Sequence, residues 1–233
     1  MPYRYLLFDA DDTLFDFRAA EKNAFTAVFR AFGYPNGEKE YHVYHEENKR
    51  CWQELEKGLC TRPQLLYNRF ERTFRALGIE GDPAAVQKAY MEELAENGIV
   101  YPETRPLLDR LKPLFKLVLI TNGAVHIQNR RLEKSHMAHY FDGIYISEQM
   151  GCAKPDPAYF HQVLADLNVT DLRQVLVIGD SLTSDVQGAV NAGLDICWFN
   201  PHHKENTAGL PVSYEIDRIG QLLPILGLEE ASV

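Results

Sequence analysis

The amino-acid sequence predicts an α/β fold in which a doubly wound parallel sheet carries an inserted all-helical segment. Short apolar runs of strand length alternate with helical segments over the second half of the chain. Parallel strands need a long crossover, usually a helix, so this alternation favours a parallel sheet with helices packed on it. The first strand-like segment lies apart from the others, at the N-terminus, and a long stretch of helical pattern follows it.

The strands are expected where short runs of apolar, β-prone residues occur. The first is the segment YRYLLF, residues 3–8, which leads into a charged loop. Four more strands are expected at residues 116–121, 143–147, 174–179 and 195–199. Helices of about residues 125–134, 156–167 and 182–192 connect them, as the crossovers of a parallel sheet require.

Helical pattern dominates from about residue 18 to about residue 100. Thr61, with Gln64 three residues later, is typical of the start of a helix, because their side chains can bond each other's backbone N–H groups. The pair Asp82-Pro83 predicts a second helix start, since Asp caps helices and Pro suits the first turn.

From this organisation we expect two domains. An α/β core is formed by residues 1–16 and 104–233, and a helical domain by residues 17–103.

Composition narrows the class of protein. The formal net charge is −9, which argues against a nucleic-acid polymer as the main partner, because such partners select a basic face. The apolar runs are far shorter than a membrane span, and no secretory signal is recognisable. The 4 cysteines form no CxxC pair. We therefore expect a cytoplasmic protein with reduced thiols. The net charge leaves room for a small anionic ligand in a local cationic pocket, and the expected assembly is a monomer or a homodimer.

Several polar residues follow the predicted strands directly or lie in the loops after them. Because ligand crevices of parallel sheets form at the carboxyl ends of the strands, these residues are expected to converge. They are Asp9, Asp11, Thr121, Lys154 and Asp180.

The residue types at this edge favour metal and phosphate chemistry. Asp9, Asp11, Asp180 and Asp185 would repel one another unless a cation held them, and an all-oxygen set suits Mg²⁺. Lys154 adds a positive charge. A site for a phosphoryl group needs both a metal ion and a cationic side chain to balance the charge of its oxygens. The hydroxyl of Thr121 and the backbone amides around Asn122 can donate hydrogen bonds to its remaining oxygens.

Four motifs in this order, FDADDTLF, ITNG, AKP and GDSLTSD, resemble those of the haloacid dehalogenase-like (HAD) superfamily. The resemblance implies a Rossmann-like core, and it implies that the helical segment is a cap domain that closes over the substrate. It also implies that Asp9 is a nucleophile that accepts the phosphoryl group, and that Asp11 is the general acid and then the general base. An acid at the position of Asp11 favours a phosphate ester over a halide as substrate.

The same resemblance implies the remaining roles in the core. Asp9, the backbone carbonyl of Asp11, and Asp180 would bind Mg²⁺. Thr121 and Lys154, together with the amides near Asn122, would bind the phosphoryl oxygens. Asp185 would support Lys154 or a metal-bound water.

Longer segments, including ISEQMGCAKPDPAYF and GDSLTSDVQGAVNAGLDICWFNPHH, resemble the YjjG-like group of pyrimidine 5′-nucleotidases. This resemblance implies a cytoplasmic phosphatase of nucleoside monophosphates. Phe17, Trp52 and Arg69 are candidates for contact with the substrate from the cap side. Alternatively, the two aromatic residues pack between cap and core, and Arg69 lies on a solvated surface.

Three other functions share part of these features. A phosphatase of another small metabolite, such as a sugar phosphate, would use the same motifs, and a phosphomutase would pass the phosphoryl group to a sugar hydroxyl instead of water. A non-catalytic binding protein of this fold is disfavoured, because binding alone needs no nucleophile beside an acid.

Overall fold

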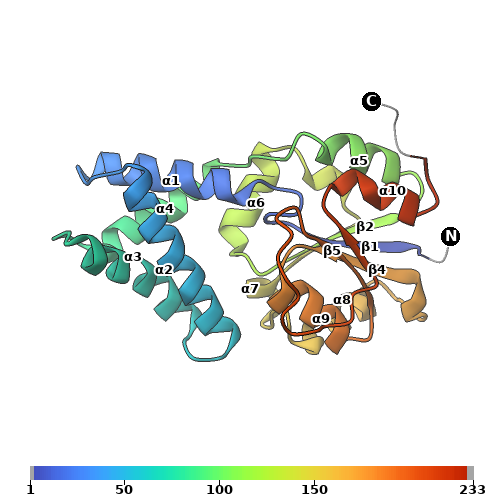
Figure 1. Ribbon diagram of the computed structural model, residues 1–233. Helices are drawn as coiled ribbons and strands as arrows, with labels where there is room; N and C mark the ends of the chain where they lie inside the picture. The colour runs from blue at the N-terminus through green and yellow to red at the C-terminus, as the bar shows by residue number, and fades with distance from the viewer. Residues whose placement is uncertain (1–2, 230–233) are drawn as a thin grey trace. The chain divides into compact units, whose positions relative to one another are not determined.

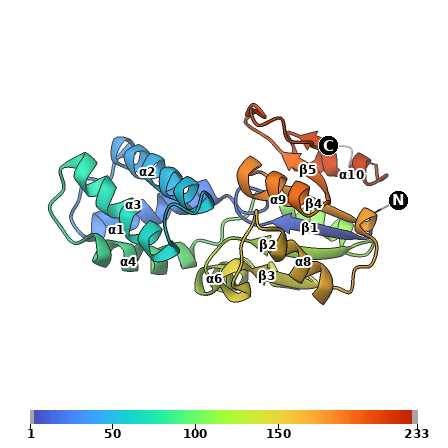
Figure 2. The same cartoon turned by 90° about the horizontal axis from the view of Figure 1, so that it is seen from below.

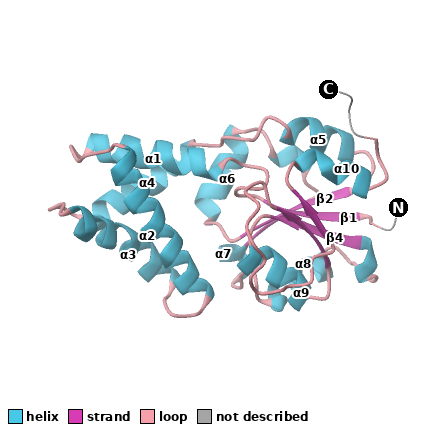
Figure 3. Ribbon diagram, in the orientation of Figure 1, coloured by secondary structure: helices cyan, strands magenta, loops and turns pink. Residues whose placement is uncertain are grey.

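The structure, a computed structural model, describes residues 3–229 and divides into two compact units. One unit combines the chain up to Phe17 with the chain from Ile99 onward, and the other spans Arg18–Gly98. The first unit contains all strands within the described residues and the second contains only helices (Figures 1 and 3).

The first unit is built on one six-stranded parallel sheet, which confirms the predicted fold class. Phe8 on the central strand lies opposite Leu119 on one neighbour and Ile178 on the other. The strands, in their order across the sheet, are β3 (Gly143–Ile146), β2 (Lys116–Thr121), β1 (Tyr5–Asp9), β4 (Val175–Gly179), β5 (Asp195–Phe199) and β6 (Tyr214–Ile216). The last of these was not predicted from the sequence.

Alternate residues of the central strands pack into two different cores because successive side chains of a strand point to opposite faces. Leu6 and Phe8 belong to one core and Leu7 to the other. Helices α5 (Thr104–Leu111), α6 (Val125–Lys134) and α10 (Leu222–Ile225) contribute to the first core. Helices α8 (Pro157–Asp166) and α9 (Gln187–Asn191) contribute to the second (Figures 1 and 2).

Shorter elements complete this unit. Helix α7 (Ser147–Met150) follows β3, and a π-helical turn at Leu182–Val186 precedes α9. The helix predicted at residues 182–192 therefore consists of two consecutive elements. Turns of 3-10 helix occupy Ala138–Tyr140, Leu172–Gln174 and Ile219–Gln221.

The second unit begins within α1 (Phe17–Ala31) and contains α2 (Glu38–Glu56), α3 (Arg62–Leu77) and α4 (Pro83–Glu96). Both predicted helix starts are confirmed. The Thr61 hydroxyl accepts from the backbone N–H of Gln64, and the Asp82 carboxylate accepts from two N–H groups of the first turn of α4. A cluster of aromatic side chains forms the core of this unit: Phe25, Phe29, Tyr44, Phe70 and Tyr90.

A buried carboxylate also lies inside the helical unit. Glu21 accepts hydrogen bonds from Tyr41 Oη at 3.0 Å and Asn48 Nδ2 at 2.7 Å, and its Oε2 lies 2.7 Å from His45 Nδ1. The hydrogen bond to Glu21 raises the pKa of His45 above its ordinary value, against the opposing effect of burial. Folding therefore shifts His45 towards its protonated form relative to the unfolded chain.

This pair predicts a pH dependence of stability. The pKa of His45 is higher in the folded than in the unfolded chain. The contribution of His45 to the free energy of unfolding is therefore complete below about pH 6.5 and is lost as the pH rises through the folded pKa. His45→Gln is expected to remove this part of the pH dependence. Thermal unfolding midpoints of the wild type and the variant across the range from about pH 5 to about pH 9 test it. A difference in midpoint between the wild type and His45→Gln that does not change with pH would contradict stabilisation by protonated His45.

Candidate active site

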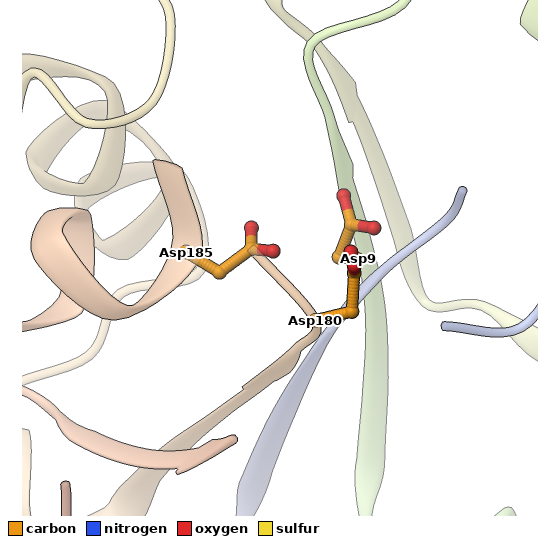
Figure 4. Close-up of side chains that lie close together, drawn as sticks. All are labelled: Asp9, Asp180 and Asp185. Atoms are coloured by element: carbon orange, nitrogen blue, oxygen red, sulfur yellow. The ribbon is translucent and has the colours of Figure 1, made fainter. Parts of the chain in front are cut away.

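Three carboxylates lie together at the carboxyl ends of the two central strands β1 and β4. Asp9 is the last residue of β1, Asp180 follows β4 directly, and Asp185 lies in the π-helical turn. One carboxylate oxygen from each lies within 4.8 Å of the others, and Figure 4 shows the three side chains close together at the strand ends. The parallel pairing of β1 with β4 brings them together, because it places both strand ends at one edge.

Asp185 reaches this cluster because the residue at the end of β4 is a glycine. A Cβ atom at Gly179 would lie 2.4 Å from Cγ of Asp185, closer than two carbon atoms approach. The backbone N–H of Ser181 also donates to Asp185 Oδ2 at 3.1 Å. The side chain of Asp185 is thus fixed against the strand end.

Replacing Gly179 by Ala is expected to push Asp185 out of place and to lower catalytic activity about 100-fold, as misplacement of about an ångström does in other sites. Gly220→Ala is the matched control, because a Cβ there meets nothing within 4 Å and the backbone needs no positive φ. Turnover of both variants, with circular dichroism as a check of folding, makes the comparison. Equal activity of the two variants would show that the close approach has no consequence.

Lys154 lies between two of the carboxylates. Its ammonium donates to Asp9 Oδ1 at 2.5 Å and to Asp185 Oδ1 at 2.6 Å, and its side chain is 1% exposed. Its backbone is held by Asn122, whose Nδ2 donates to the Lys154 carbonyl while Oδ1 accepts from the Lys154 N–H. The side chain of Asn122 therefore positions the loop that carries Lys154. The sequence also predicts that Asn122 contacts phosphate, and the backbone N–H of Asn122 is the group to which this prediction now applies.

The pKa shifts follow from burial and from the excess of negative charge. Burial raises the pKa of Asp9, and the charges of Asp185 and Asp180 add to this against the effect of Lys154. Burial also raises the pKa of Asp180, to about 6, although Lys204 Nζ lies 3.2 Å from its Oδ2. Burial alone would lower the pKa of Lys154, but Asp185 and Asp9 hold it above its ordinary value. Lys154 is thus held in its cationic form between Asp9 and Asp185, and with Asp180 beside them the cluster favours a further cation.

The donor set fits a hard divalent ion. Asp9 and Asp180 offer carboxylate oxygens, and among the described residues neither His nor Cys belongs to the group of possible ligands around them. Oxygen-only ligation is the preference of Mg²⁺.

Thr121, the last residue of β2, also lies at this edge. Its Oγ1 accepts hydrogen bonds from the backbone N–H of Gly123 and from Gln128 Nε2, both at 3.1 Å. The hydroxyl proton can therefore be donated to a ligand. The backbone N–H of Thr121 donates to the Tyr159 hydroxyl, which itself donates to the Tyr145 carbonyl.

Asp11 lies in the loop after β1, and its carboxylate accepts hydrogen bonds from Gln128 and Arg131 of α6. Neither of these two residues was predicted from the sequence. Their spacing of three residues places them on one side of a helix, but only the packed structure shows that this side faces Asp11.

The three cap candidates have different surroundings. Phe17 packs with its ring 5.6 Å from the guanidinium carbon of Arg131, and Trp52 is half-buried with the Arg62 guanidinium over its ring. Arg69 is buried within the helical unit, where its guanidinium donates to Gln87 and Asn48 and lies over the Tyr90 ring. The solvated position considered for Arg69 is therefore wrong, because these partners enclose its charge.

Known proteins resemble this chain over most of its length. Residues 3–193 match the model of the haloacid dehalogenase-like hydrolase family. The chain is 37% identical to the pyrimidine 5′-nucleotidase PynA of Streptococcus pneumoniae over 227 residues, covering 97% of this chain and 96% of that one. It is 33% identical to the pyrimidine 5′-nucleotidase YjjG of Escherichia coli, covering 97% and 99%.

The fold also matches a solved structure closely. The crystal structure of YfnB from Bacillus subtilis, bound to magnesium, has a TM-score of 0.94 and 35% identity, and covers 98% of this chain and 100% of that one. None of the helices within residues 3–229 has the length and apolarity needed to cross a lipid bilayer.

Proposed function

The chain belongs to the haloacid dehalogenase-like hydrolase family, and on that premise we propose that it is a Mg²⁺-dependent phosphatase of pyrimidine nucleoside 5′-monophosphates. The observation that carries the chemistry is the buried ammonium of Lys154 between Asp9 and Asp185, beside Asp180 at the same edge. The substrate class is supported by two relatives, PynA and YjjG, that carry this activity in their names.

The first step is attack by a carboxylate oxygen of Asp9 on phosphorus. Lys154 holds Oδ1 of Asp9, so Oδ2 is the oxygen that forms the new O–P bond. The ester O–P bond breaks, and the leaving nucleoside oxygen takes a proton from Asp11. Lys154 and the Thr121 hydroxyl stabilise the negative charge on the phosphoryl oxygens.

The second step returns the enzyme to its starting state. Asp11, now ionised, accepts a proton from a water molecule whose oxygen attacks phosphorus, and the bond to Asp9 breaks to release phosphate. Asp185 keeps Lys154 in place through both steps. Bound Mg²⁺, held by Asp9, Asp180 and the backbone carbonyl of Asp11, would neutralise charge on the phosphoryl group.

Phosphate release from a panel of substrates tests the proposal. We expect UMP, dUMP and dTMP to be hydrolysed in the presence of Mg²⁺ and purine monophosphates and sugar phosphates to be poor substrates. Selectivity for sugar phosphates would keep the chemistry and refute the substrate class. A bisphosphate intermediate with no free phosphate would indicate a phosphomutase, and no turnover of any ester would refute the enzymatic proposal.

Metal removal has two expected effects. Treatment with EDTA should abolish phosphate release, and Mg²⁺ should restore it. Independently of activity, Mg²⁺ should raise the thermal unfolding midpoint of the wild type, because a ligand that binds only the native state stabilises it. Asp180→Asn should weaken this shift, since the variant loses one anionic ligand. A midpoint that does not respond to Mg²⁺, together with full activity in EDTA, would contradict the metal site.

A further inference from the structure

Two buried polar side chains of α6 point at the proposed general acid and base. Gln128 and Arg131 are one helical turn apart and are 1% and 0% exposed. We propose that they are positioning residues that hold the Asp11 carboxyl group for both proton transfers, an inference that rests on the proposed function.

The contacts fix both oxygens of Asp11. Arg131 Nη1 donates to Oδ1 at 2.5 Å, and Gln128 Nε2 donates to Oδ2 at 2.8 Å. One donor on each oxygen fixes the rotation of the carboxyl plane as well as its position. Asp11 lies in a loop and its side chain is 27% exposed, so its orientation depends on these two donors.

Gln128 also links the acid to the phosphate site. Its Nε2 donates to Thr121 Oγ1 at 3.1 Å, so one amide group contacts the side chains proposed to protonate the leaving group and to bind the phosphoryl oxygens. Gly123 makes room for this arrangement, since a Cβ there would lie 2.5 Å from Gln128 Cγ.

Arg131 is itself held by aromatic side chains. Its guanidinium carbon lies 4.9 Å from the ring centre of Phe15 and 5.6 Å from that of Phe17. Stacking of a cation on aromatic rings restricts its motion and partly compensates its removal from water. Phe17, a candidate for substrate contact in the sequence, can therefore act on catalysis through Arg131.

The two contacts to Asp11 should matter only for substrates whose leaving group needs a proton. A nucleoside leaves as a poor alkoxide unless it is protonated, so its departure depends on a well-placed Asp11. A p-nitrophenolate ion leaves without a proton. Loss of the positioning contacts should therefore affect kcat/KM for a nucleoside monophosphate far more than kcat/KM for p-nitrophenyl phosphate.

The test compares Arg131→Met with Arg130→Met on both substrates. Arg130 is the neighbouring arginine on α6, and its side chain is 36% exposed and paired with Glu133. For Arg131→Met we expect kcat/KM for UMP to fall about 30-fold or more, with less than about a 3-fold change for p-nitrophenyl phosphate. Arg131→Lys should recover part of the loss, and Arg130→Met should behave as the wild type.

An equal fall on both substrates would assign Arg131 a structural role and overturn the proposal, as would an unchanged or increased kcat/KM for UMP. If Arg131→Met does not fold, Arg131→Gln, which keeps a polar side chain at this buried position, provides the same test, and the same selective loss is expected. Hydrolysis of UMP by the wild type tests the proposed function, and this result does not depend on the behaviour of the Arg131 variants. If the wild type prefers another alkyl phosphate to UMP, that ester replaces UMP in the comparison.

Discussion

Asp9→Asn is expected to lower phosphate release from UMP on the order of 10⁴-fold or more, because an amide cannot replace the attacking carboxylate. The variant should still fold, since Asn has nearly the shape of Asp and its Oδ1 can still accept the hydrogen bond from Lys154. Steady-state phosphate release, with substrate binding measured separately, separates loss of chemistry from loss of binding.

Substrate binding is expected to survive in Asp9→Asn, because Thr121 and Lys154 remain. Undiminished turnover in this variant would mean that a contaminating phosphatase produces the signal or that Asp9 is not the nucleophile. A variant that neither binds substrate nor folds would point to a structural role of the carboxylate instead.

Lys154→Met is expected to lower both activity and stability. Its ammonium is buried between two carboxylates, so its loss leaves Asp9 and Asp185 facing each other without a counter-charge. Breaking a buried pair in this way costs about 3 kcal/mol of the free energy of unfolding. Activity should fall about 10³-fold, because a donor to the phosphoryl oxygens disappears as well.

Lys204→Met is the matched control for stability. Lys204 pairs with the third carboxylate, Asp180, but its side chain is 49% exposed, so its removal should change the free energy of unfolding by less than about 1 kcal/mol. Chemical unfolding in the presence of EDTA compares the two variants without a contribution from metal. Equal losses in both would contradict the assignment of Lys154 as the central cation.

Most strands of the sheet were predictable because their apolar runs reach strand length and are separated by clear breaks. The runs at 116–121 and 195–199 coincide with β2 and β5. The edge strand β6 has no comparable run, because it consists only of Tyr214–Ile216 and just one of its residues is buried. A strand this short depends on pairing with β5 rather than on its own pattern.

The convergence of the proposed site residues at one sheet edge was predictable for a different reason. Parallel strands bring their carboxyl ends together whatever the details of packing, so Asp9, Thr121 and Asp180 converge once the strands are known. The supporting contacts depend on tertiary structure. Nothing local in the sequence shows that the side chain of Asn122 holds the backbone of Lys154, 32 residues away.

Arg69 illustrates the same limit in the helical unit. Its charge favoured a solvated face or a ligand contact from sequence alone, since arginine is seldom fully buried without partners. In the structure, the amide groups of Gln87 and Asn48 and the ring of Tyr90 supply those partners. All three come from helices other than α3, which carries Arg69, so no pattern within α3 reveals them.

Asp9 is proposed to carry the phosphoryl group between the two steps, and a variant that stalls after the first step would reveal this covalent intermediate. Asp11→Asn reacted with p-nitrophenyl phosphate should form the phosphoenzyme, because this leaving group needs no acid, and should hydrolyse it slowly, because the base is missing. Mass spectrometry of the acid-quenched protein is expected to find one added phosphoryl group, on the peptide that contains Asp9. Release of p-nitrophenol with that peptide unmodified, or with phosphate on another residue, would contradict the role of Asp9 as nucleophile.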